Sequence, residues 1–300
     1  MYNNFDTIRR HSSTLFINKD FRNAELEQAL TAGEKKLRER HELTPVRSSD
    51  FSRVYRFTTR FGNTERCIYF KQYLCRSALD FIKHLIRSSR ARRAFTATLM
   101  LEKNGFEAPV VAAMGEYKFS FLERENFLLT IEVEGAIQIN QIVPESLEKL
   151  SEEELQIDSA LRFFYTMETQ DKRGLIRALG QTIGKMHEAG IFHGDLRLGN
   201  VLLRRETSGW HFFFIDNERT RKFRKLPSRL RLKNLVQANM LRTRALSSTD
   251  RMRFFKSYLG SNPQVRKDWK NWSRKTILKT EARLRKKVLA TQNITTKLHM

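Results

Sequence analysis

A short polar run in the second half of the chain constrains the possible folds most strongly. It begins at His193 and reads HGDLRLGN. An apolar-striped helical pattern at residues 171–190 precedes it, and a short apolar strand pattern at residues 211–215 follows it and leads directly to Asp216. At equal residue frequencies its fixed positions recur by chance about once in 160,000 starting points. The fold must therefore place a polar loop between a helix and a strand that ends in a carboxylate.

The spacing of this run matches the H-x-D-L-x-x-x-N catalytic loop of phosphoryl-transfer enzymes. A transferred phosphate needs a carboxylate that accepts the proton of the acceptor hydroxyl, and Asp195 is the candidate. The polyphosphate of ATP needs Mg²⁺, for which Asp216 and the amide oxygen of Asn200 offer oxygen ligands. Arg197 can place a cation against the transferred phosphate. The alternatives are an ordinary hydrogen-bonded turn and, for His193, support of the loop by hydrogen bonds.

Strand patterns dominate the first part of the chain. Alternating residues on both sides of Gly62 predict a hairpin, and a basic helical pattern follows at residues 87–106. Two further strand patterns lie at residues 108–119 and 125–135. An amphipathic pattern at residues 24–37 predicts a surface helix or an N-terminal extension. From residue 144 onward the patterns are mainly helical.

Lys71 lies on the second predicted strand of the hairpin, where a lysine can bind the nonreacting phosphates of a nucleotide. A strand lysine that only faces solvent is the alternative. The segment before the hairpin has no glycine-rich phosphate loop, and Ser48 and Ser49 would bind phosphate weakly in its place. Kinases pair the strand lysine with a glutamate of the next helix, but the aligned residue here is Ala94. The predicted nucleotide site therefore departs from the usual pattern at two points.

Together these segments resemble the bacterial lipopolysaccharide kinase family, relatives of the protein kinases that phosphorylate Kdo or heptose sugars of the lipid A core. The resemblance runs from about Arg53 to about Leu259. It is carried by Lys71, the basic helix, MHEAGIFHGDLRLGNVLL, FFFIDNERTR, LKNLVQANM and RMRFFKSYL. It implies ATP and magnesium as cofactors and a sugar hydroxyl of the lipopolysaccharide core as acceptor.

We therefore predict an α+β, bilobal protein-kinase-like fold with a β-rich N-lobe and a mainly helical C-lobe. Residues 1–133 would form an N-terminal extension and a β-rich nucleotide-binding lobe. Residues 134–300 would form a helical catalytic and acceptor-binding lobe that ends in a basic helix.

The net charge of the chain is +23, with 56 Lys and Arg against 33 Asp and Glu. Such a charge attracts nucleic acid, anionic lipid surfaces or phosphorylated substrates. A run without acidic residues follows Asp216, from Arg219 to Lys233, and a solvated basic loop is its alternative reading. Because Phe223 is its only aromatic residue, nucleic acid is not an expected partner. The predicted acceptor contacts are Arg219, Arg221, Lys222, Arg224 and Lys225.

The remaining features concern the cellular setting. Only Cys67 and Cys75 occur, which excludes a disulfide-stapled scaffold and favours a reducing compartment. No stretch approaches the roughly 18 apolar residues of a membrane span. The basic segment at residues 269–290 fits a helix that binds an anionic membrane surface or one that packs on its lobe. We expect a cytoplasmic protein that is peripheral on the inner face of the inner membrane.

The expected function is an ATP-dependent phosphotransferase that acts on an alcohol group of the lipopolysaccharide core. A small-molecule kinase of the aminoglycoside type and an atypical protein kinase are alternatives. A pseudokinase that binds anionic lipid or RNA is a third. Ala94 and the missing glycines favour the pseudokinase, whereas the trio of Asp195, Asn200 and Asp216 opposes it.

Overall fold

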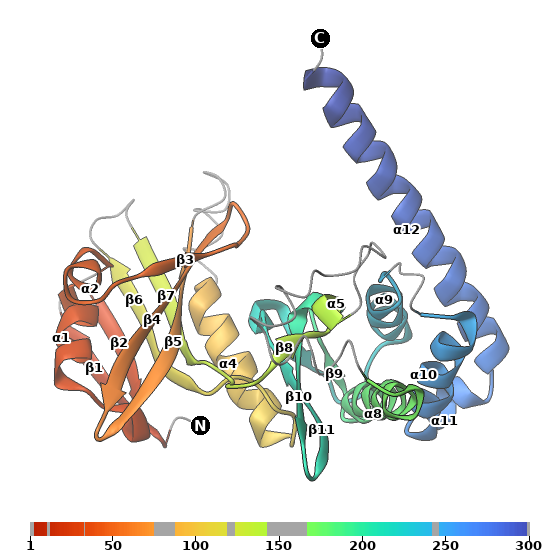
Figure 1. The fold of residues 1–300 in the computed structure, drawn as a ribbon, viewed down its shortest axis with the longest axis horizontal. Helices are drawn as coiled ribbons and strands as arrows, with labels where there is room; N and C mark the ends of the chain where they lie inside the picture. Colours follow the sequence, from red (N-terminus) through yellow and green to blue (C-terminus); the bar gives the residue numbers. More distant parts are fainter. Residues whose placement is uncertain are drawn as a thin grey trace. The chain divides into compact units, whose positions relative to one another are not determined.

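The computed structural model forms two compact units, both drawn in Figure 1. It describes residues 3–10, 13–32, 34–74, 88–118, 124–142, 167–241 and 246–298. The predicted helical segment that begins at residue 144 lies partly outside these ranges. The first unit comprises residues 1–103, 108–134 and 217–219, and the second comprises residues 104–107, 135–216 and 220–300.

The first unit is built on a seven-stranded antiparallel sheet with the spatial order β1-β2-β6-β7-β5-β4-β3. The hairpin predicted around Gly62 is confirmed, since Phe61 pairs with Thr64 and Gly62 adopts a positive φ of 57° in the turn. The strands are β1 (Phe5–Arg10), β2 (Ser13–Asn18), β3 (Thr44–Val46), β4 (Ser52–Phe61), β5 (Thr64–Tyr73), β6 (Val111–Lys118) and β7 (Arg124–Ile131).

Two helices cover one face of this sheet, after a short 3₁₀ helix, η1 (Lys19–Phe21). The single helix predicted over residues 24–37 is wrong in its bounds, because α1 spans Ala24–Ala32 and α2 spans Glu34–Arg40. The sequence has Gly33, a poor helix former, at the junction.

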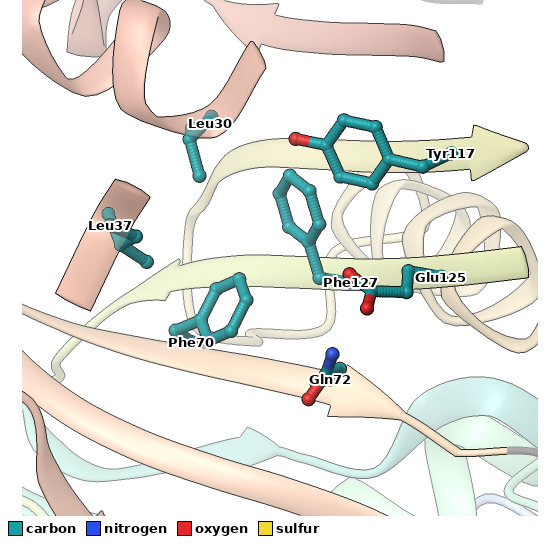
Figure 2. Close-up of a pocket in the computed structure, with 7 residues that line it drawn as sticks. All are labelled: Leu30, Leu37, Phe70, Gln72, Tyr117, Glu125 and Phe127. Carbon is teal, nitrogen blue, oxygen red and sulfur yellow. The ribbon is translucent and has the colours of Figure 1, made fainter. Parts of the chain in front are cut away.

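Figure 2 shows the core beneath these two helices, with Leu30 and Leu37 facing aromatic rings of the sheet. The residues around this part of the core are Leu30, Leu37, Phe70, Gln72, Tyr117, Glu125 and Phe127. The space that they enclose has no room for a water molecule. This face of the sheet is therefore closed core.

Helix α4 (Arg90–Lys103) packs on the opposite face of the sheet. Ala91, Ala94 and Phe95 are buried there in one cluster with Tyr73 and other sheet residues. The helix ends shortly before Gly105, which adopts a positive φ of 76°, as the sequence pattern predicts. A short 3₁₀ helix, η3 (Asn217–Arg219), belongs to the same unit and packs on α4.

The second unit is mainly helical, and its long helix α8 (Thr169–Glu188) packs closely on α10 (Ser248–Gly260). Glycines permit this approach, since a Cβ atom at Gly180 would lie 2.4 Å from the carbonyl oxygen of Phe254. The mixture of helices and antiparallel strands confirms the predicted α+β class. The other elements are β8 (Ile137–Gln138), α5 (Ile139–Ile142), β9 (Ile191–Phe192), η2 (Leu198–Asn200), β10 (Val201–Glu206), β11 (Gly209–Phe214), β12 (Arg221–Lys222), α9 (Ser228–Ala238), α11 (Pro263–Arg266) and α12 (Trp269–Leu298).

Candidate active site

The predicted catalytic loop connects β9 to β10 in the second unit. His193 is fully buried at its start, and its Nε2 lies 3.2 Å from the carbonyl oxygen of Ile215. Its Nδ1 accepts a hydrogen bond of 3.3 Å from the backbone N–H of Asp195. Both contacts suit one neutral tautomer with the proton on Nε2. His193 therefore supports the loop, and it ties the loop to the end of β11.

The two predicted metal ligands, Asn200 and Asp216, are brought together by backbone pairing. The N–H of Ile215 donates to the carbonyl oxygen of Asn200 at 3.0 Å. The Asn200 side-chain Nδ2 donates to the carbonyl oxygen of Asp195 at 2.8 Å, so Oδ1 is the amide atom that could bind a cation. Asp216 has a φ of 59°, a left-handed conformation that costs energy in residues other than glycine and is often found at functional sites.

Arg197 donates hydrogen bonds to the carboxylate of Asp195 and is also close enough to Asp216 to be affected by its charge. Its Nε lies 2.9 and 3.0 Å from the two carboxylate oxygens of Asp195, and its Nη2 also contacts Oδ2. These hydrogen bonds raise the pKa of Arg197, and the negative charge of Asp216 raises it further. The structure therefore gathers Asp195, Arg197, Asn200 and Asp216 into one charged cluster, as the spacing of the run predicts.

Two residues of α9 form hydrogen bonds with the predicted catalytic loop, and the sequence analysis did not single them out. Asn234 is fully buried, accepts from the backbone N–H of His193 at 3.2 Å, and donates to its carbonyl oxygen at 2.6 Å. Gln237 accepts from Asn234 at 2.8 Å and donates to Asp195 Oδ1 at 3.2 Å. The available signal was a pair of polar residues at helical spacing within the apolar segment LKNLVQANM.

Behind these residues lies a buried polar network around His187. Its ring contacts Tyr258 Oη at 2.9 Å and Asn234 Oδ1 at 3.1 Å. Burial, aided by the charge of Arg231, lowers the pKa of His187 to about 3. Arg231 is itself only 3% exposed and donates to Tyr258 and Asn262. The basic run therefore includes one arginine that faces the core and cannot contact an acceptor.

Acid should destabilise the protein partly through His187. Its folded pKa of about 3 lies below its ordinary value of 6.5, so the unfolded state binds the extra proton between these limits. Stability should fall as pH decreases through this window, by at most about 1.4 kcal/mol per pH unit for this group. We expect the free energy of unfolding, measured with urea at pH values from 7 to 4, to fall less steeply with decreasing pH in His187→Gln than in wild type. Parallel slopes for wild type and variant would contradict this assignment.

The predicted nucleotide residues lie in the first unit. Lys71 stands on β5 on the face that carries α4, with its Nζ 5.2 Å from the centre of the Tyr73 ring. Ala94 is 2% exposed, so the α4 position expected to hold a glutamate is a packed methyl group. The Ser48 hydroxyl donates to the carbonyl oxygen of Ser52 at 2.7 Å, and Ser49 Oγ lies 3.0 Å from Ser52 Oγ. Phosphate binding by the two serines stays a prediction.

The acid-free run is attached to the start of the catalytic loop. In β12, Arg221 pairs with Phe192 and Lys222 pairs with Ile191 of β9, the strand that leads into His193. The backbone N–H of Phe223 also donates to the carbonyl oxygen of Gly190 at 2.9 Å. The side chains of Arg221, Lys222, Arg224 and Lys225 are exposed. Arg219 is exposed as well, but it belongs to the first unit.

The cluster suits magnesium better than a metal held entirely by protein. Within the described residues, no group of three or more His, Cys, Asp or Glu side chains is arranged to hold a metal ion. Mg²⁺ usually keeps waters and substrate phosphate oxygens and takes only one or two protein ligands. One carboxylate, from Asp216, and one amide oxygen, from Asn200, fit that requirement.

A loop carboxylate, an adjacent amide and a strand-end carboxylate are groups that phosphotransferases use. The chain belongs to the lipopolysaccharide kinase (Kdo/WaaP) family, whose sequence model matches residues 38–258. The fold is also similar to the solved structure "WaaP in complex with acyl carrier protein", with a TM-score of 0.56 and 18% identity over 87% of this chain and 97% of that one. The predicted family and the bilobal kinase-like fold are thus confirmed.

Shorter local similarities connect the chain to subunits of the EKC/KEOPS complex. Subunit BUD32 of Coccidioides immitis is 44% identical over 39 residues, which are 13% of this chain and 14% of that protein. Subunit Tp53rkb of Mus musculus is 27% identical over 120 residues, 40% of each chain. The chain therefore spans less than half the length of these curated relatives.

Proposed function

We propose that this protein transfers the γ-phosphate of ATP to a hydroxyl of a Kdo or heptose sugar in the lipopolysaccharide core. The observation that carries the proposal is the cluster of Asp195, Asn200 and Asp216 at the catalytic loop. Membership of the lipopolysaccharide kinase family supports the acceptor class.

In this proposal Asp195 accepts the proton of the acceptor hydroxyl. Arg197 and Gln237 donate hydrogen bonds to both oxygens of its carboxylate and hold it in one orientation. Asn200 Oδ1 and the Asp216 carboxylate would hold Mg²⁺, which neutralises phosphate charge when bound. Arg197 adds a fixed positive charge beside both carboxylates.

Mass spectrometry of the lipid A core tests this function directly. Cells that lack the gene should lose one phosphate group from the core, and the wild-type gene should restore it. The Asp195→Asn gene should not restore it. An unchanged core, with the purified protein instead phosphorylating a soluble aminoglycoside or a protein, would favour the alternative kinases.

Replacing Lys71 should weaken the use of ATP. The loss of one charged contact to phosphate corresponds to about a tenfold rise in the KM for ATP in Lys71→Ala. Arg53→Ala is the matched control, because Arg53 is an exposed cation on β4 whose side chain leaves the other face of the sheet. Wild-type ATP kinetics in Lys71→Ala would show that other residues hold the nucleotide.

We also propose that α12 contacts the anionic inner face of the inner membrane. Its exposed apolar residues include Trp269, Ile277 and Leu278, which are 39%, 48% and 54% exposed. Trp269 and Ile277 line a shallow groove of about 340 Å³ together with the cations Lys270 and Arg274. Within the described residues, no helix is both long and apolar enough to cross a membrane. An apolar surface ringed by cations is typical of helices that lie on anionic lipid.

Vesicle cosedimentation tests this contact. The protein should bind vesicles that contain phosphatidylglycerol, and Ile277→Ser with Leu278→Ser should weaken that binding several-fold. Val110→Ser is the control, because Val110 is an exposed apolar residue of the first unit. Equal binding by all three proteins would leave α12 as a helix of the lobe surface.

A further inference from the structure

The first unit contains a buried ion pair that the proposed chemistry does not yet use. Arg90 begins α4, and its Nε donates to Glu218 Oε2 at 2.6 Å. The side chains of Arg90 and Glu218 are only 6% and 7% exposed. Glu218 lies in η3, two residues after the proposed metal ligand Asp216.

The same guanidinium holds two further segments of the first unit. Its Nη1 donates to the carbonyl oxygen of Phe51 at 2.7 Å and lies 3.5 Å from that of Leu74. Its Cζ lies 5.0 Å from the centre of the Tyr73 ring, which also contacts Lys71. Phe51 follows the serine segment at the usual place of a phosphate loop, and Leu74 directly follows the strand of Lys71. Arg90 therefore contacts the backbone of the first two segments and a side chain of the third, and these are the segments next to the residues that are predicted to hold nucleotide and metal.

A further hydrogen bond connects η3 to α4, in which Asn217 Nδ2 donates to Thr98 Oγ1 at 3.2 Å. Asn217 and Glu218, the two residues directly after Asp216, are thus both anchored on this helix. A buried ion pair contributes little net stability compared with apolar side chains of similar size, although it can specify a position. The position on α4 where kinases carry a glutamate is Ala94, one turn after Arg90.

We propose that Arg90 and Glu218 are positioning residues that fix Asp216 for metal binding. In kinases this helix supplies a glutamate that pairs with the strand lysine. In this chain α4 instead supplies a cation, Arg90, and η3 supplies the carboxylate of the ion pair, Glu218. The inference rests on the proposed function, since it takes Asp216 as a metal ligand. Removal of the ion pair should make the backbone at Asp216 more mobile. Metal binding should then weaken although every proposed metal ligand is still present.

Binding of Mn²⁺ together with a nonhydrolysable ATP analogue, followed by electron paramagnetic resonance, tests this inference without turnover. Glu218→Gln should bind Mn²⁺ about tenfold more weakly than wild type. Because a lone buried charge can unfold the protein, the double variant Arg90→Met with Glu218→Leu removes both charges at once. It should keep a cooperative thermal transition and show the same weakened metal binding, with a raised Mg²⁺ requirement in turnover.

The matched control is another ion pair of α4, between Arg92 and Glu116 of β6. Arg92→Met with Glu116→Leu should leave Mn²⁺ affinity within about twofold of wild type. Asp216→Asn separates the two proposals, because unchanged Mn²⁺ binding in that variant overturns the metal assignment itself. If Asp216→Asn weakens Mn²⁺ binding but the folded double variant binds Mn²⁺ as tightly as wild type, the positioning role of Arg90 and Glu218 is wrong.

Discussion

Asp195→Asn should lower kcat at least about a hundredfold while the protein still binds ATP. The substitution keeps the size of the side chain and one oxygen that can accept from Gln237. An amide cannot accept the proton of the acceptor hydroxyl at neutral pH, so the variant loses the proposed base and little else. The loss should appear in kcat, because the base acts in the transition state.

Phosphate transfer to purified lipid A core and calorimetric titration with an ATP analogue measure the two quantities separately. Asp268→Asn, an exposed aspartate just before α12, is the control and should keep wild-type kcat. An Asp195→Asn protein that phosphorylates the core at the wild-type rate would contradict the proposed kinase mechanism with Asp195 as its base. An Asp195→Asn protein that no longer binds ATP would point to a role for Asp195 in nucleotide binding.

The parts of the fold and site that the sequence predicts correctly are local. The hairpin around Gly62 and the helix before Gly105 follow from residues that are adjacent along the chain. The cluster of Asp195 and Asn200 likewise comes from one short loop, and β11 brings Asp216 to it by pairing directly with β10. Short-range periodicity and turn residues are sufficient to find such features.

The parts that the sequence did not reveal depend on contacts between distant residues. Arg90 and Glu218 are separated by 128 positions, and Gln237 lies 42 positions from Asp195. No spacing rule connects such pairs, although their polar character within apolar helical patterns is a signal of burial with a partner. The burial of Arg231 was not apparent for a related reason. It belongs by composition to the basic run, but the period of α9 puts it on the buried face with Asn234.

The exposed cations of the acid-free run should bind the acceptor. Four exposed cations of this run lie on β12 or just after it, and β12 pairs with β9, the strand that leads into the predicted catalytic loop. Reversal of all four to glutamate, in a protein otherwise unchanged, should raise the KM for the lipid acceptor far more than the KM for ATP. The four are Arg221, Lys222, Arg224 and Lys225.

The size of that effect follows from exposed charge pairs, which contribute at most about 1 kcal/mol each. Four of them at roughly 0.7 kcal/mol correspond to about a hundredfold rise in KM at low salt. The difference between wild type and variant should shrink toward 0.3 M salt, because the Debye length is only about 10 Å at 0.1 M. The control reverses four exposed cations of the first unit and so makes the same change in net charge. These are Arg9, Arg10, Lys35 and Arg60.

A hundredfold effect that is confined to the run, absent from the control and sensitive to salt identifies a local binding surface for an anionic acceptor. Equal effects in both reversed proteins would instead indicate attraction by the net charge of +23 alone. If the acceptor KM does not change in either protein, the run is a solvated loop. A neutral or cationic acceptor, as in kinases of the aminoglycoside type, would then fit the site better than the phosphorylated lipid A core.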